Sequence, residues 1–570
     1  MDRRYITTPI YYVNDRPHIG HCYTTLVADI AARAHRLMGD EVFFLTGTDE
    51  HAEKVAKAAA DNGMSPMDWA TRNADRFREA FDFMGFSHDD FVRTTEDRHK
   101  DKASAYIQRL MDSGEIALGD YSGWFDPSQE EYVPENVAAE HDFKSPVTGT
   151  PLEKRTEQNY FFKLSKHEDW LRQQIEAGRI RVLPEQRKNE VLGRIKQGLN
   201  DVPVSRRVKE GDADWGITMP GDSDHRIYVW IEALCNYLTV VDTDERREFW
   251  PAEGHGPVPV THFMAKDILW FHAVIWPAML RALGERPPET VYAHAYFIAE
   301  GRKMSKSLGN FIEIDTLRAY AERYSLDAVR WYLATQGPLG ATDADFAYAR
   351  FVEVYNADLA NGIGNATSRV GNMVEKYFDG SLPKTCNGEF GLPGGKALVI
   401  ALAAREAAGK PVDDPTRTFD FATETTAAVA KATEQIGACQ LDEAVRCGIA
   451  LVKRVDDFIS YTAPFTLAKK LDEHEHGETA LATILYSCAE ALRIASLLLA
   501  PAMPGKMAEL WRGWDCEHLH DPADPESGFV APLAELAAWG GPHGLKAGQT
   551  IRKGDALFMR ADAKEAAPEA

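Results

Sequence analysis

The sequence predicts an α/β protein in which a parallel-sheet domain is interrupted by an insertion and followed by an α-helical bundle. A strand-like run over residues 5–13 leads through a turn into a helical pattern that ends near residue 38, and a second buried-strand pattern covers 41–47. Between 118 and 225, aromatic, proline and glycine residues become more frequent, which indicates a change of structure. From residue 351 onward, apolar residues recur at helical spacing.

The composition indicates a cytoplasmic protein of several domains. The chain has 570 residues, 44% of them hydrophobic, which is enough for about three or four domains. No run reaches the ~18 apolar residues of a membrane span, and Pro9, Asn14 and Asp15 interrupt any signal-peptide core. The seven cysteines are dispersed and form no Cys-x-x-Cys pair, which fits a reducing compartment without a disulfide framework.

The net charge of −23 argues against a protein that coats nucleic acid non-specifically. It does not exclude RNA, because local basic strips and stacking on unpaired bases can hold RNA. Such strips occur at 187–188, 206–209 and 302–306.

The first strand and turn lead into His18, Gly20 and His21, in the first turn of a helix that we expect Gly39 to end. Free N–H groups and the positive end of the helix dipole attract phosphate there. Gly20 leaves no side chain between the helix start and a ligand, and two imidazoles three residues apart can donate to one phosphate chain. Alone, this pattern is equally compatible with a buried helix start and two incidental histidines.

A second stretch, 302–310, is a loop of small residues that carries Lys303 and Lys306. Alone it could be a solvated basic turn. Together and in this order, the two stretches resemble the paired signatures of class I aminoacyl-tRNA synthetases. Further local matches, from Tyr5 to about Arg560, make the resemblance specific to the methionyl-tRNA synthetase family.

The resemblance implies a class I Rossmann-like catalytic domain split by a connective insertion, then a stem-contact fold and an α-helical anticodon-binding bundle. The expected boundaries are 1–117 and 226–300 for the two halves of the catalytic domain, 118–225 for the insertion, 301–350 for the stem-contact fold with the lysine loop, 351–530 for the bundle, and 531–570 for a C-terminal tail that packs back on the core.

The implied reaction joins L-methionine to ATP as methionyl-adenylate and then transfers methionine to tRNA(Met), for initiation and elongation. It needs no protein nucleophile, so catalysis would come from alignment and from donors to the phosphates, with Mg²⁺ bridging phosphate oxygens. The implied catalytic residues are His18, His21, Lys303 and Lys306, and the implied ATP site adds Gly20, Lys266, Asp267 and Ser305.

Aromatic residues are dense around 228–237 and 263–272. Such clusters are most often plain core, but rings also pack well against a thioether sulfur. Asp49, just past the second strand, could cap a helix or, by resemblance, hold the substrate ammonium. The methionine pocket implied by the resemblance consists of Ile10, Tyr12, Asp49, Trp230, Ala233, Tyr237 and His272.

We expect no zinc, although many relatives carry zinc knuckles in the insertion. The corresponding segments, 126–131 and 145–149, hold no cysteine, and tetrahedral zinc needs Cys or His in close pairs. A lone His141 does not supply such a pair. Two further departures from the family pattern are Ala52 and Ala265, where glycine is usual.

In the bundle, helices are expected over 417–436, 441–461 and 477–500, with a Gly- and Pro-rich linker at 380–395. A polar stripe before the linker could be solvated surface. Its segment 365–369 matches the family's anticodon motif Asn-x-x-Ser-Arg, and Phe465 stands after a proline where the family has tryptophan. The implied anticodon residues are Asn365, Arg369 and Phe465, with Phe465 stacking on a base.

The resemblance also implies a monomer, since the sequence leaves no room for the appendage that makes some relatives dimeric.

Three alternative functions stay open. A cysteinyl enzyme would need zinc cysteines, a non-enzymatic tRNA-binding paralogue would have no use for both phosphate motifs, and a nucleotidyltransferase would leave the helical region unexplained.

Overall fold

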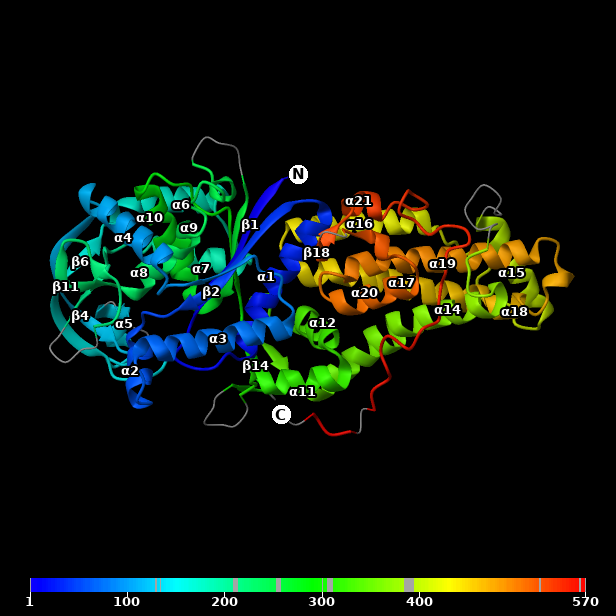
Figure 1. Ribbon diagram of the computed structural model, residues 1–570, viewed down its shortest axis with the longest axis horizontal. Helices are drawn as coiled ribbons and strands as arrows, with labels where there is room; N and C mark the ends of the chain where they lie inside the picture. Colours follow the sequence, from blue (N-terminus) through cyan, green and yellow to red (C-terminus); the bar gives the residue numbers. More distant parts are fainter. Residues whose placement is uncertain are drawn as a thin grey trace.

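The computed structural model describes residues 2–128, 131–133, 135–208, 214–252, 258–299, 301–304, 311–383, 394–521, 524–562 and 565–568. The molecule is elongated, with an α/β part at one end and a helical bundle at the other (Figure 1).

The α/β part is built on a six-stranded sheet in the order β3-β2-β1-β12-β13-β7. All five neighbouring pairs are parallel, which confirms the predicted parallel sheet. The strand order reverses between β1 and β12, and ligands of such sheets bind beyond the strand ends at this point. The strands are β1 (Arg3–Tyr12), β2 (Glu41–Asp49), β3 (Asp90–Arg93), β7 (Arg181–Leu183), β12 (Val260–Ala265) and β13 (Thr290–His294).

The first half of this domain differs from the sequence prediction in one detail. Strand β2 continues past Gly47 to Asp49, and the next helix is capped by Ala52, so neither Thr48 nor Asp49 is a helix cap. Gly39 ends the first helix with φ 94°, as expected. The helices are α1 (Ile19–Met38), α2 (Glu53–Asp61), α3 (Pro66–Met84) and α4 (Asp97–Asp112).

The insertion forms two antiparallel sheets, in the orders β5-β4-β6-β8 and β10-β11-β9. It is not separate from the main sheet, because β7 lies within 118–225 yet pairs with β13. Its elements are β4 (Ile116–Asp126), β5 (Glu131–Val133), α5 (Glu135–Glu140), β6 (Glu153–Phe162), α6 (Glu168–Glu176), α7 (Glu185–Ile195), β8 (Val202–Pro203), β9 (Ser205–Arg207), β10 (Thr218–Met219) and β11 (Asp222–Ile227).

The chain then returns to the main sheet and forms a small sheet in the order β15-β14-β16 beside two helices. The elements are α8 (Val229–Leu234), α9 (Asn236–Thr239), the π-helix η4 (Phe271–Ile275), α10 (Trp276–Ala282), β14 (Phe297–Ala299), β15 (Arg302–Lys303), α11 (Ile314–Tyr324), α12 (Leu326–Gln336) and β16 (Ala344–Phe346).

The remainder is a helical bundle, and the three helices expected there are confirmed as α16, α17 and α19. Helix α15 was not expected, and residues 384–393 of the expected linker lie outside the described residues. Helix α19 is long and apolar enough to cross a membrane, but 89% of its apolar window is buried inside the protein. The elements are α13 (Tyr348–Val354), the π-helix η6 (Tyr355–Gly364), α14 (Asn365–Phe378), α15 (Gly394–Ala407), α16 (Phe421–Gly437), α17 (Leu441–Thr462), α18 (Pro464–Leu467), α19 (Gly477–Leu499), α20 (Pro504–Gly513), β17 (His520–Asp521), β18 (Asp524–Phe529) and α21 (Leu533–Leu536).

The C-terminal tail turns back along α14 and η6 toward α11 (Figure 1). The Tyr355 hydroxyl donates to the Met559 carbonyl at 2.6 Å, and the Asn356 amide exchanges two hydrogen bonds with the Ala561 backbone, at 3.0 and 2.9 Å. The tail therefore packs on the π-helix that joins the bundle to the rest of the molecule.

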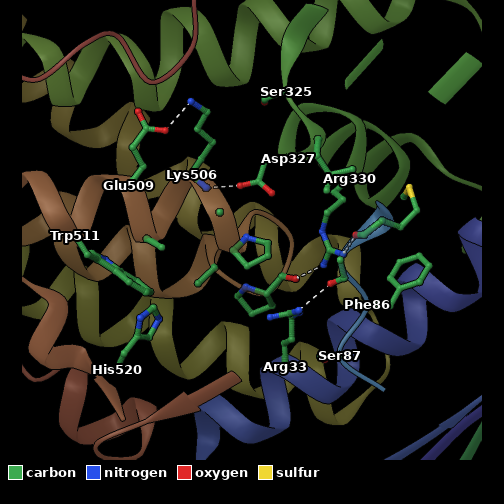
Figure 2. Close-up of a pocket in the computed structure, with 18 of the residues that line it drawn as sticks. Arg33, Phe86, Ser87, Ser325, Asp327, Arg330, Lys506, Glu509, Trp511 and His520 are labelled. Carbon is green, nitrogen blue, oxygen red and sulfur yellow. Dashed lines mark hydrogen bonds and ion pairs between the residues drawn. The ribbon is translucent and has the colours of Figure 1, made fainter. Parts of the chain in front are cut away.

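Arg330 of α12 holds three parts of the chain together beside a cavity of about 640 Å³ (Figure 2). Its guanidinium, which is fully buried, donates to Asp29 of α1 at 2.6 Å, to the Met84 carbonyl at 2.9 Å and to the Ala502 carbonyl at 3.0 Å. Burial opposes ionisation of Asp29, but Arg33 and Arg330 outweigh it and lower its pKa. Breaking such a buried pair typically costs about 3–5 kcal/mol, so this junction fixes the bundle on the catalytic part.

Candidate active site

The site is organised by two reciprocal hydrogen bonds at the start of α1. His18 is the residue that caps the helix, and its Nδ1 accepts from the Gly20 N–H at 3.0 Å. In return, the His18 N–H donates to Nδ1 of His21 at 3.2 Å. Because both Nδ1 atoms act as acceptors, each neutral ring carries its proton on Nε2.

The two rings lie with centroids 3.8 Å apart. Burial lowers the pKa of His21 well below its usual value, and the neighbouring His18 lowers it further. His21 is therefore a neutral imidazole near pH 7, with an N–H to donate from Nε2.

Gly20 has a second role beside the one predicted. A Cβ at this position would lie 2.9 Å from Cε1 of His18. The glycine thus makes room for the capping imidazole itself, and a side chain here would displace the ring.

These groups open into a cavity of about 590 Å³ at the carboxyl ends of β1 and β12, where the strand order reverses. Most of the predicted ligand-binding residues of the described chain come together here. Those that line the cavity are Ile10, Tyr12, His18, Gly20, His21, Asp49, Trp230 and Asp267.

Phe311, just after the lysine loop, also lines this cavity. Ser305 and Lys306 lie outside the described residues, and of Lys303 only the backbone, in β15, is described. The chain that follows the loop is tied to the helix start, because the Ile19 N–H donates to the Ile312 carbonyl at 3.1 Å. The ring of Phe311 lies edge-on to His18, with centroids 4.9 Å apart.

The predicted methionine residues divide into two groups. Ile10, Tyr12, Asp49 and Trp230 line the cavity, where Trp230 is stacked on Phe271 with centroids 4.2 Å apart.

The other three, Ala233, Tyr237 and His272, are buried and do not line it. His272 donates from Nδ1 to the Ile268 carbonyl at 2.9 Å and accepts from the Tyr237 hydroxyl at 2.8 Å. Burial lowers the pKa of His272 to about 4, so this pair is neutral.

Lys266 does not line the cavity. Its ammonium group lies 2.8 Å from the Asp343 carboxylate and 4.6 Å from the centre of the Tyr296 ring. Ala265, where the family has glycine, does line the cavity, next to Asp267.

Residues that were not predicted also line it, among them His294, Tyr296 and Phe271. His294 is the last residue of β13, so it lies at the same sheet edge as Asp49. Its position at a strand end is the sequence feature from which a ligand-binding role could have been predicted. Its Nε2 lies 2.8 Å from the Thr24 hydroxyl, and burial lowers its pKa to about 4.

The predicted anticodon residues lie on the bundle, away from the sheet. Asn365, at the start of α14, is exposed, whereas Arg369 is partly buried and forms an ion pair with Asp456 of α17. Phe465 is 43% exposed on α18, which follows α17 directly after Ala463. An exposed aromatic side chain at this helix end agrees with the prediction of a stacking residue.

A family model described as tRNA synthetases class I (M) matches residues 4–141 and 139–371. The methionine–tRNA ligase of Streptomyces coelicolor is 38% identical over 574 residues, covering 99% of this chain and 97% of that protein. The methionine–tRNA ligase of Caldanaerobacter subterraneus subsp. tengcongensis is 37% identical, covering 98% and 79%. A structure of Mycobacterium tuberculosis methionyl-tRNA synthetase in complex with methionyl-adenylate aligns with a TM-score of 0.80 at 32% identity, over 98% of this chain and 100% of that chain.

The matches extend over the sheet, the insertion and the helical bundle. The chain belongs to the methionyl-tRNA synthetase family of class I tRNA synthetases.

Proposed function

We propose that this chain is a methionine–tRNA ligase, which activates L-methionine with ATP and then transfers the methionyl group to tRNA(Met). The observation that carries the proposal is a pair of imidazoles, His18 and His21, that each accept a backbone hydrogen bond at the helix start. Both line a cavity that Asp49 and Trp230 also line. Its relatives bear that name, and one similar structure contains methionyl-adenylate.

The cavity offers different chemistry to the two substrates. Tyr12, Trp230 and Phe271 supply aromatic surface, against which a thioether packs well. The Asp49 carboxylate is placed to bind the substrate ammonium group. His272 and Tyr237 lie behind this lining and would support it, or contact methionine if the stacked rings move.

In the first step, an oxygen of the methionine carboxylate attacks the α-phosphorus of ATP, and pyrophosphate leaves with the electron pair of the broken bond. His18 and His21 donate to the phosphates from Nε2, and Lys303 and Lys306 add positive charge from the loop. One aimed donor contributes on the order of 3 kcal/mol to such a transition state. In this proposal Asp267 contacts the nucleoside end of ATP. Lys266 could contact it as well only if its ammonium group moved away from the Asp343 carboxylate.

Mg²⁺ would enter with ATP, since it usually keeps to phosphate oxygens and one or two carboxylates. Besides Asp49, which this proposal assigns to the ammonium group, Asp15 and Asp267 line the cavity and would offer such oxygens. When bound, the ion neutralises phosphate charge.

In the second step, the terminal ribose hydroxyl of tRNA attacks the methionyl carbonyl carbon and AMP leaves.

Activation is tested by methionine-dependent exchange of pyrophosphate into ATP, measured with each proteinogenic amino acid. We expect exchange with methionine, and a decrease of at least about a hundredfold in His21→Ala and in Lys306→Ala, because each removes an aimed donor. His141→Ala is the control, since this exposed histidine lies in the insertion.

Near-full exchange in either variant, with an unchanged melting temperature, would refute the assigned roles. Exchange with cysteine rather than methionine, or no exchange at all, would favour another class I enzyme or a non-enzymatic tRNA-binding protein.

Anticodon reading is tested by comparing tRNA charging with pyrophosphate exchange in the same variants. We propose that Asn365 and Arg369 hydrogen-bond to anticodon bases and that Phe465 stacks on one. Stacking is worth ~1–3 kcal/mol per base, so Phe465→Ala should lower charging roughly ten- to a hundredfold. Arg369→Ala should also lower charging, and exchange should be unchanged in both, because activation needs no tRNA.

Phe465→Trp is the matched control, and it should charge at least as well as the wild type. Equal losses of charging and exchange in Arg369→Ala and Phe465→Ala would mean that these residues are structural.

We further propose that the insertion folds without zinc. Where relatives carry cysteine pairs, Asp126 accepts from the N–H and the hydroxyl of Ser128, at 2.8 and 2.6 Å. The Ser128 and Thr148 hydroxyls are 2.6 Å apart, and Ser145 Oγ accepts from the Thr148 N–H at 3.1 Å. The Ser128–Thr148 bond links the two segments that a zinc ion would otherwise join, and the other bonds hold the turn within each segment.

Purified protein should therefore contain no stoichiometric zinc, and chelators should leave its melting temperature unchanged. Elemental analysis that finds about one tightly bound zinc per chain would contradict this.

The proposal also includes a monomeric, cytoplasmic enzyme. The six described cysteines are buried and free, which is in keeping with the cytoplasm.

A further inference from the structure

We propose that Glu232, held by His51 and His99, is a positioning residue for the methionine end of the cavity. The inference rests on the proposed function, because it assigns the Asp49 and Trp230 side of the cavity to the amino acid. None of the three residues lines the cavity itself.

The three side chains form a buried, fully engaged cluster. Oε1 of Glu232 accepts from Nδ1 of His51 at 2.9 Å, and Oε2 accepts from Nε2 of His99 at 2.8 Å. Glu232 and His99 are 0% exposed and His51 is 6% exposed. One carboxylate thus joins two histidines that are far apart in the sequence.

Two of the three residues lie on segments that carry predicted pocket residues. His51 lies two residues after Asp49, and Glu232 stands between Trp230 and Ala233 on α8. The carboxylate therefore fixes the distance between the ammonium-binding side of the cavity and its aromatic wall.

The second histidine extends the cluster to two further helices. Nδ1 of His99, on α4, lies 3.1 Å from the Thr239 hydroxyl at the end of α9, the helix that also carries Tyr237. Since α4 contributes no residue to the cavity lining, it serves as a support for the pocket segments.

The charge of the cluster is also determined by its neighbours. Burial opposes ionisation of Glu232, but His51 and His99 outweigh it and lower its pKa, so the group is a carboxylate near pH 7. The nearby Glu50 is engaged elsewhere, by Arg93 at 2.7 and 3.0 Å. The Trp215 ring packs edge-on against His51, with centroids 5.3 Å apart, and separates it from solvent.

Only a carboxylate can accept from both histidines in this arrangement. The isosteric Glu232→Gln change opens no cavity, but its NH₂ group faces an imidazole nitrogen that donates in the wild type, so that contact is kept only if the ring moves its proton to the other nitrogen. A merely structural role would lower stability and leave the two substrates equally affected. A positioning role predicts a defect specific to methionine, because a small misplacement in a binding site has large effects.

The test measures KM for methionine and for ATP in the exchange assay, together with the melting temperature. We expect Glu232→Gln and His51→Ala to raise KM for methionine about tenfold or more, with KM for ATP within about twofold of the wild type. His51→Asn should restore KM for methionine, because its amide nitrogen can replace Nδ1 as the donor. If Glu232→Gln does not fold, the two His51 variants decide alone.

The control is His167→Ala, which removes another buried histidine paired with a glutamate, Glu115, at 3.3 Å. It should lower the melting temperature and leave KM for methionine unchanged. Equal increases of both KM values, or identical behaviour of His51→Ala and His51→Asn, would overturn the inference. A wild type without methionine-dependent exchange would instead refute the proposed function.

Discussion

The two hydrogen bonds by which the His18 and His21 side chains cap the start of α1 are the constraint on which the rest of the site depends. They close the helix start with side-chain nitrogens, satisfy the N–H groups of Gly20 and His18, and place the proton of each ring on Nε2. An acidic cap would satisfy the same N–H groups but would offer no donor to phosphate. The cap therefore serves the stability of the helix and the chemistry of the site together.

The start of α1 also explains how the chain brings distant segments together. The chain just after the lysine loop is hydrogen-bonded to the helix, because the Ile19 N–H donates to the Ile312 carbonyl, although these two residues lie about half the chain apart. Near the middle of the same helix, Asp29 binds Arg330, which in turn holds the carbonyl of Ala502. One helix thus connects the reacting groups with the bundle, whose position relative to the cavity must be fixed if a single tRNA is to contact both.

Much of this organisation could be predicted from sequence because it is local. A strand, a turn and a helix ended by Gly39 are encoded in consecutive residues, and so are the long helices α16, α17 and α19. Local patterns could not reveal β7, a strand of three residues that joins the sheet only through β13. Helix α15 was missed because it begins in a segment rich in glycine and proline.

The site shows the same limit. The histidines at the helix start were predictable, but the direction of Lys266 is decided by Asp343 and Tyr296, which are distant in sequence. Gly20 lines the cavity, and the sequence did not indicate that it also makes room for the His18 ring. The cluster of His51, His99 and Glu232 forms only when folding brings its three segments together, and no spacing in the sequence indicates it.

The central claim is that His18 and His21 present Nε2–H groups to the phosphates of ATP while their Nδ1 atoms hold the helix start. A crystal structure with methionine and a non-hydrolysable ATP analogue tests it most directly. We predict both Nε2 atoms within about 3.2 Å of phosphate oxygens, with both backbone hydrogen bonds to Nδ1 retained. Phosphates bound elsewhere, or rings turned so that Nδ1 faces them, would contradict the claim.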